Sequence, residues 1–365
     1  MGWTVFFILF FGIAAIIPAI WSIIGFVQDR SRFWPALLGV CWAVALLLVT
    51  FIGIAINWGD CPVQMGTASK DAVKCYRGDR ETGCKPDLWR LECGQSAGCT
   101  GIPPRSFCPP GQKPTFPFCE AIEFGASVKQ PWATWSDLSF IAAGLWILWL
   151  FQYFGRFGTG KFARFFSSGA NPMVLISPLS ITYALIVIFM GPPSQWFHAS
   201  IKEWAGWFDT MSVVFWLMFN GLYVLYMVAF AMWGNGRELA RTLAVLIAWV
   251  VFMIIFGAIA AKFPDDRTAL YFASGGLWGS MEFLYLILAA ARKEKVRYRR
   301  TAGLFWGNLA LLGATMTIWI FFNDSIVPAT WCQSGESFPG HAIFHSLASF
   351  STILTFFSFG SERSV

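Results

Sequence analysis

The feature that most constrains this chain is a series of apolar runs, each long enough to cross a lipid bilayer. A helix needs about 20 residues to span a hydrocarbon core of about 30 Å. We predict such runs near residues 3–27, 34–57, 133–153, 174–192, 205–233, 242–261, 268–291, 302–322 and 340–360. With 56% hydrophobic and only 13% charged residues, the 365-residue chain has too few charges to cover a soluble globule. The sequence therefore predicts an all-helical, polytopic membrane protein with about nine spans.

Basic residues predict the orientation of these spans, because cytoplasmic loops of membrane proteins carry an excess of Lys and Arg. Most of them fall in alternate loops: Arg30, Arg32, Arg156, Lys161, Arg164, Arg237, Arg241, the segment 292–300 and Arg363. The short loops on the other side contain only Lys202, Lys262 and Arg267. We therefore expect an extracytoplasmic N-terminus and a cytoplasmic C-terminus. The net charge of +6 follows from this topology and does not indicate a nucleic-acid partner.

A long polar segment, residues 58–132, divides the chain into three expected parts. Two N-terminal transmembrane helices (1–57) precede it, and a seven-helix bundle (133–365) follows it. The cysteines expected outside the cytoplasm are Cys61, Cys75, Cys84, Cys93, Cys99, Cys108, Cys119 and, in a later loop, Cys332. In an oxidising compartment these residues allow four disulfides, and metal binding is the weaker alternative because paired CxxC motifs are absent. The segment is also a candidate surface for a protein partner.

The three histidines of the chain fall near the outer ends of predicted spans. His341 and His345 are four residues apart in GHAIFHSLAS, which places both imidazoles on one helical face, about 6 Å apart. His198 lies at the outer end of the fourth span. Three imidazoles at one depth meet the requirement of a catalytic zinc site, which has three protein ligands and one position open to water. For the pair alone, interfacial histidines bonded to water or lipid headgroups are an equal alternative.

Two polar residues close to His198 are candidates for catalysis beside such a metal. Asp209 could act as a general base or orient a ligand imidazole; alternatively it caps a helix that begins around 207–210. Ser194 precedes His198 by four residues and could donate to a developing oxyanion. Its alternative is an N-cap after Pro192 and Pro193, which we expect to kink or interrupt the span.

These residues together resemble a known superfamily. The chain is similar to the CREST superfamily of seven-helix membrane proteins in three features: SQWFH, Asp209 eleven residues after that histidine, and HAIFH followed by FFSF. That superfamily includes alkaline ceramidases, progestin and adipoQ receptors and the hydrolases that remodel GPI anchors. The resemblance covers roughly residues 119–360. It implies zinc bound by His198, His341 and His345, with Asp209 and Ser194 beside the metal.

The resemblance also bears on a second metal. CE at 119–120 and PWATWSDLSF from 131 are similar to the opening segment of the ceramidases, which can hold calcium there. Of the acidic positions such a site needs, only Glu120 is clearly present, with Ile122 and Gln130 where acidic or amide ligands would be expected. Calcium is therefore a much weaker expectation than zinc.

Two functions from different classes are expected from these observations. The first is a zinc-dependent hydrolase that cleaves an amide or ester of a ceramide-like lipid, a phospholipid or a GPI lipid near the outer leaflet. The second is a receptor or accessory subunit that keeps the zinc for stability or lipid sensing. A transporter is less favoured, because the sequence has no obvious internal repeat or pair of matched broken helices.

Three further polar residues lie at membrane depth. Glu282 is expected to line the substrate cavity or to bond to a neighbouring helix. For Ser136 and Asp137, at the start of the third span, we favour helix packing or capping over chemistry.

Overall fold

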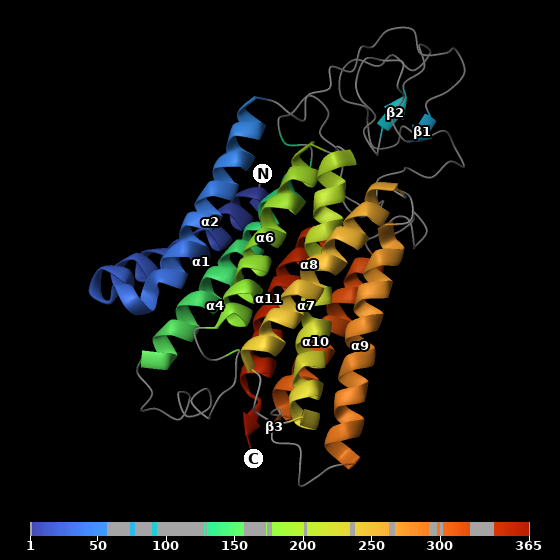
Figure 1. The fold of residues 1–365 in the computed structure, drawn as a ribbon. Coiled ribbons are helices and arrows are strands. Elements are labelled where there is room, and N and C mark those ends of the chain that lie inside the picture. Colours follow the sequence, from blue (N-terminus) through green and yellow to red (C-terminus); the bar gives the residue numbers. More distant parts are fainter. Residues whose placement is uncertain are drawn as a thin grey trace.

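The computed structural model describes residues 2–56, 74–76, 90–92, 128, 130–156, 173, 177–200, 203–233, 238–262, 267–291, 298–299, 302–321 and 339–364. Its helices are α1 (Gly2–Gln28), α2 (Arg30–Ala55), α3 (Pro131–Ser136), α4 (Leu138–Arg156), α6 (Pro178–Ser200), α7 (Glu203–Trp233), α8 (Glu238–Lys262), α9 (Arg267–Ala291), α10 (Ala302–Phe321) and α11 (Gly340–Gly360). Two short antiparallel pairs join β1 (Lys74–Tyr76) to β2 (Arg90–Glu92) and β3 (Tyr298–Arg299) to β4 (Arg363–Ser364). The long helices form a bundle with α1 and α2 at one edge and α9 at the other (Figure 1).

Within the described residues, seven helical segments are long and apolar enough to cross a membrane: Trp3–Gln28, Phe33–Ala55, Pro131–Leu150, Trp204–Ala229, Ala240–Lys262, Ala302–Phe321 and Gly340–Gly360. They fit an integral, multi-pass membrane protein, as the sequence predicts. Of the predicted spans at 174–192 and 268–291, residues 178–192 lie in α6 and 268–291 in α9, but their polar and glycine residues leave both helices outside this set. The total of nine spans and the orientation of the termini therefore stay predictions.

Helix α6 extends further than the sequence indicates. We expected the Gly-Pro-Pro step to kink or interrupt it; an interruption is not found, because Pro192 and Pro193 lie inside one continuous helix that ends at Ser200. Residues 190–200 are all buried. Prolines are tolerated in membrane helices where neighbouring helices satisfy the freed backbone groups. His198 is consequently held on a rigid element.

Helices α4 and α6 approach one another closely because two glycines lie between them. A Cβ on Gly144 would lie 2.8 Å from the backbone oxygen of Ala184, and one on Gly191 would lie 2.7 Å from that of Asp137. Small residues at such crossings let the backbones of membrane helices pack directly. The Gly191 contact brings the start of α4 against the part of α6 that precedes His198.

A polar connection in the middle of the bundle joins α6, α7 and α11. The buried Tyr183 hydroxyl donates to the backbone oxygen of Thr352 at 2.6 Å and accepts from Nε1 of Trp216 at 3.1 Å. Interhelical hydrogen bonds of this kind each contribute about 1 kcal/mol in a membrane protein. They fix the depth of α11 relative to α6, and with it the depth of the histidines.

The two N-terminal helices form a hairpin on the outside of this bundle. Helix α1 packs against α2 and α4, and α2 packs against α4 and α6. Their outward faces carry exposed apolar side chains such as Leu9, Ile13 and Ile52, which suits contact with lipid. Most of the cysteine-rich segment 58–132 and Cys332 lie outside the described residues, as do the disulfides predicted there.

Candidate metal centre

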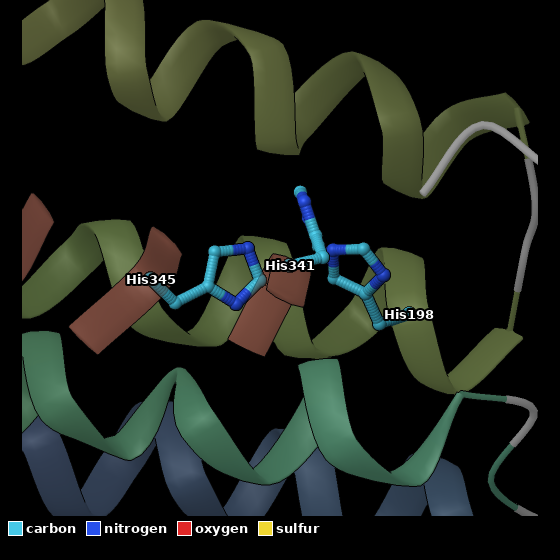
Figure 2. Close-up of side chains that lie close together, drawn as sticks. All are labelled: His198, His341 and His345. Atoms are coloured by element: carbon cyan, nitrogen blue, oxygen red, sulfur yellow. The ribbon is translucent and has the colours of Figure 1, made fainter. Parts of the chain in front are cut away.

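His198, His341 and His345 come together at one end of the bundle. One ring nitrogen of each histidine lies within 4.8 Å of the corresponding atoms of the other two. The ring centroids are 5.0 Å apart for His198 and His341, 5.1 Å for His198 and His345, and 4.4 Å for His341 and His345. Figure 2 shows the three rings next to one another. This group could hold a metal ion.

The two histidines of α11 share a face because they are four residues apart in one helix. Helix α11 begins at Gly340, directly after Pro339, and the amide of Ile343 already donates to the backbone oxygen of Pro339 at 2.9 Å. His341 and His345 are each only 4% exposed. The alternative of interfacial histidines that bind water or lipid headgroups does not fit this burial.

His198 is held by Gln130, the residue before α3. Oε1 of the Gln130 side chain lies 2.7 Å from Nδ1 of His198, and the backbone N–H of Gln130 donates to the backbone oxygen of His198 at 3.0 Å. An amide oxygen only accepts hydrogen bonds, so this contact places the proton of a neutral imidazole on Nδ1. Nε2 of His198 then keeps its lone pair for a metal.

His345 is held by two adjacent residues at the junction of α3 and α4. Nδ1 of His345 lies 2.9 Å from Oγ of Ser136 and 2.9 Å from Oδ1 of Asp137. The Ser136 hydroxyl donates to the backbone oxygen of Ala133 at 2.8 Å, which leaves its oxygen free to accept from His345. Nδ1 of His345 therefore donates to Ser136 and lies at ion-pair distance from the Asp137 carboxylate, and Nε2 is the atom available to a metal.

Ser136 and Asp137 lie where the sequence suggests capping, since Asp137 is the C-cap of α3, and the structure adds a contact of each residue with His345. Both are fully buried, and both contact His345. A signal for this was present in TWSDLSF, where an acid begins a span at the predicted depth of the histidines. The partner of that acid depends on how α4 and α11 are packed, which the sequence pattern does not contain.

Asp209 and Ser194 also lie in this region. Asp209 is partly buried and interacts electrostatically with His345 and Asp137. The buried Ser194 side chain lies one turn before His198 on α6 and interacts with the Asp137 carboxylate. Both residues thus interact with Asp137, and their catalytic roles stay predictions.

The capping alternatives for these two residues are wrong. Asp209 lies inside α7, which begins at Glu203, so it does not cap that helix. Ser194 lies inside the continuous helix α6. Both side chains are therefore held by regular helix, where their direction toward the site is fixed by the helical repeat.

The donor set fits a transition metal better than calcium. Imidazole nitrogen suits zinc, copper, iron and nickel, whereas calcium takes six to eight oxygen ligands. Gln130 stands at one of the positions where the ceramidase resemblance would place a calcium ligand, and its side chain is hydrogen-bonded to His198. Glu120 and Ile122 lie outside the described residues. The carboxyl groups of Asp137 and Asp209 interact with each other in this region, and a bound cation would favour the charged form of both.

Glu282 belongs to a different part of the bundle. Its Oε1 accepts from Nε1 of Trp278 at 3.1 Å, one turn earlier on the same helix α9. We expected this carboxylate to line the cavity or to bond to a neighbouring helix; the contact found here is within its own helix.

Comparison with known protein families finds no match for this chain, and comparison with curated proteins finds none either. The similarity to the CREST superfamily therefore stays a prediction that rests on SQWFH, Asp209 and HAIFH.

Proposed function

We propose that this protein is an intramembrane zinc-dependent hydrolase that cleaves an amide or ester bond of a membrane lipid. The observation that carries the proposal is the buried group of His198, His341 and His345 in a bundle of apolar helices. Structural zinc sites close with a fourth protein ligand, whereas catalytic sites keep one position open. A set of three imidazoles matches the catalytic arrangement, and zinc is the metal that the CREST resemblance implies.

Three polar residues would orient the ligands. Gln130 would hold His198, and Ser136 with Asp137 would hold His345, so that each imidazole presents Nε2. Partners of this kind raise the basicity of ligand imidazoles and limit their rotation. When bound, zinc would supply a Lewis acid that activates water at neutral pH.

Asp209 and Ser194 would carry the proton and charge movements. Asp209 would accept a proton from the water that attacks the lipid carbonyl, because its carboxyl group interacts electrostatically with His345. Ser194 would donate a hydrogen bond to the oxyanion. The apolar bundle would bind the acyl chain, and this binding energy would position the scissile bond.

The proposed orientation of the chain places this chemistry near the outer leaflet. The short basic loops then lie in the cytoplasm, and the ends of α6 and α11 that carry the histidines face the other side. A ceramide-like lipid, a phospholipid or a GPI lipid would be the substrate, and the cysteine-rich segment would be available to a protein partner.

A receptor or accessory subunit is the second candidate function. The near-complete burial of the three imidazoles would equally suit a metal that stabilises the bundle or reports on bound lipid. Turnover separates this candidate from the hydrolase.

The first experiment is elemental analysis of the full-length protein in detergent, beside a His198→Ala, His341→Ala double variant. We expect about one zinc per chain, lost in the double variant. Phe350→Ala is the control, because Phe350 lies on α11 but is half exposed. A folded wild-type protein without zinc would overturn the proposal.

A lipid screen then tests the reaction itself. Wild-type protein with bound zinc is given ceramides, phospholipids and GPI lipids, and products are followed by mass spectrometry. Hydrolysis that is lost with His341→Ala supports the enzyme. Zinc binding without hydrolysis of any of the three classes favours the receptor or accessory subunit.

A further inference from the structure

The C-terminal end of α2 contacts the bundle through a buried hydrogen bond. Nε1 of Trp196 donates to Oγ1 of Thr50 at 2.6 Å, and Thr50 and Trp196 are 1% and 8% exposed. The Thr50 hydroxyl donates to the backbone oxygen of Leu46 at 3.0 Å. Its one proton is therefore used within α2, and its oxygen is directed at Trp196.

Trp196 links Thr50 to the two segments that carry His198 and Asp209. It lies two residues before His198 on α6, and two residues of an α-helix correspond to about 200° of rotation. Its ring also packs edge-on against Phe208 of α7, with centroids 5.6 Å apart. Phe208 directly precedes Asp209. Thr50 thus holds α6 from the side opposite to the imidazole.

The next residue of α2 reaches the third segment of the site. Phe51 packs against Trp135 of α3, with ring centroids 6.2 Å apart. Trp135 directly precedes Ser136 and Asp137, the partners of His345. Two consecutive residues of α2 therefore contact Trp196, near His198, and Trp135, near Asp137, and Trp196 in turn contacts Phe208 beside Asp209.

We propose that the N-terminal hairpin supports the metal centre without binding the metal. Thr50 and Phe51 act as positioning residues that hold α6 and the α3–α4 junction in place. This inference rests on the proposed metal site and goes beyond it, because it assigns a role to helices that the seven-helix resemblance does not include. The hairpin fixes the depth and rotation of α6 through Trp196. Loss of the Thr50 acceptor removes a buried hydrogen bond that joins α2 to α6, and such a loss is costly inside a packed bundle.

The experiment compares zinc affinity in three forms of the full-length protein. Thr50→Val keeps the shape of the side chain and removes the acceptor, whereas Thr50→Ser keeps the hydroxyl. Affinity is measured by titrating zinc against a competing chelator in detergent, and thermal unfolding is recorded for each form. Thr317→Val is the matched control, because the exposed Thr317 hydroxyl donates only to the Gly313 backbone oxygen, at 2.8 Å, in α10.

We expect Thr50→Val to weaken zinc binding about 3- to 10-fold, less than the 10- to 100-fold loss typical of groups bonded directly to a ligand. Thr50→Ser and Thr317→Val should bind zinc as the wild type does. Unchanged affinity in Thr50→Val, whatever its melting temperature, would show an ordinary packing contact and overturn this inference alone. A wild-type protein that binds no zinc would overturn both this inference and the proposed function.

A second variant covers the case in which Thr50→Val does not fold. Trp196→Phe removes the N–H donor and keeps an aromatic ring against Phe208. We expect the same loss of zinc affinity, and unchanged affinity would overturn the inference as above.

Discussion

Oδ1 of Asp137 lies 2.9 Å from Nδ1 of His345, although the two residues belong to the first and last helices of the predicted seven-helix bundle. Both side chains are buried, which protects the contact from water. A carboxylate behind a ligand imidazole is a frequent partner in metal sites, where it fixes the ring and makes it a better donor. The contact therefore connects the packing of α4 on α11 with the affinity of the proposed metal.

Asp137→Asn should weaken zinc binding about 10- to 100-fold, because it removes the charge behind His345 with little change of shape. Chelator competition in detergent measures the effect. Asp29→Asn, in the turn between α1 and α2, is the matched control and should leave the affinity unchanged. Equal affinities of the Asp137→Asn and wild-type proteins would show that the carboxylate does not support the ligand.

Gln130→Leu should lower zinc affinity about tenfold, since it removes the acceptor that orients His198. Gln130→Glu retains an acceptor oxygen and should bind zinc at least as well as the wild type. Gln28→Leu, an exposed position at the end of α1, serves as the control. The prediction fails if Gln130→Leu and Gln130→Glu have the same affinity.

Asp209→Asn should keep about one zinc per chain and lose turnover, because an amide cannot accept the proton from water. Zinc content and lipid hydrolysis are measured on the same sample. Loss of zinc in this variant would instead make Asp209 a residue that holds the site together.

Removal of zinc should lower the melting temperature, because a ligand that binds only the folded state stabilises it by about 2.7 kcal/mol at 100 times its Kd. The measurement is thermal unfolding before and after chelation, followed by return of zinc. The His198→Ala, His341→Ala variant should show no response to either step. A wild-type protein with equal melting temperatures in both states would contradict the prediction.

Tyr183→Phe should destabilise the bundle by about 1 kcal/mol, because Tyr183 bonds to both α7 and α11. Unfolding in mixed detergent gives the free energy of unfolding. Zinc stoichiometry should stay at the wild-type value, and its loss would mean that this bond is needed to assemble the site.

The extent of the helices could be predicted because backbone polar groups in a bilayer must be satisfied within the segment, so long apolar runs form helices. The expectation that the Gly-Pro-Pro step at 191–193 interrupts the span was wrong, for a local reason. Pro192 and Pro193 break helices in isolation, whereas this segment is buried against α4 and the helix continues through it. Tertiary contacts therefore reversed a local preference there.

The sequence by itself determined the membrane character of the chain and the candidate ligands, because apolar runs and polar residues at membrane depth are local properties. The four-residue spacing of His341 and His345 is also local, since one helix places both on one face. Only the tertiary structure decided which partners these residues have. Gln130 and Asp137 contact the histidines, and Thr50 contacts Trp196, across helix contacts whose depth and rotation depend on how α2, α4, α6 and α11 pack together.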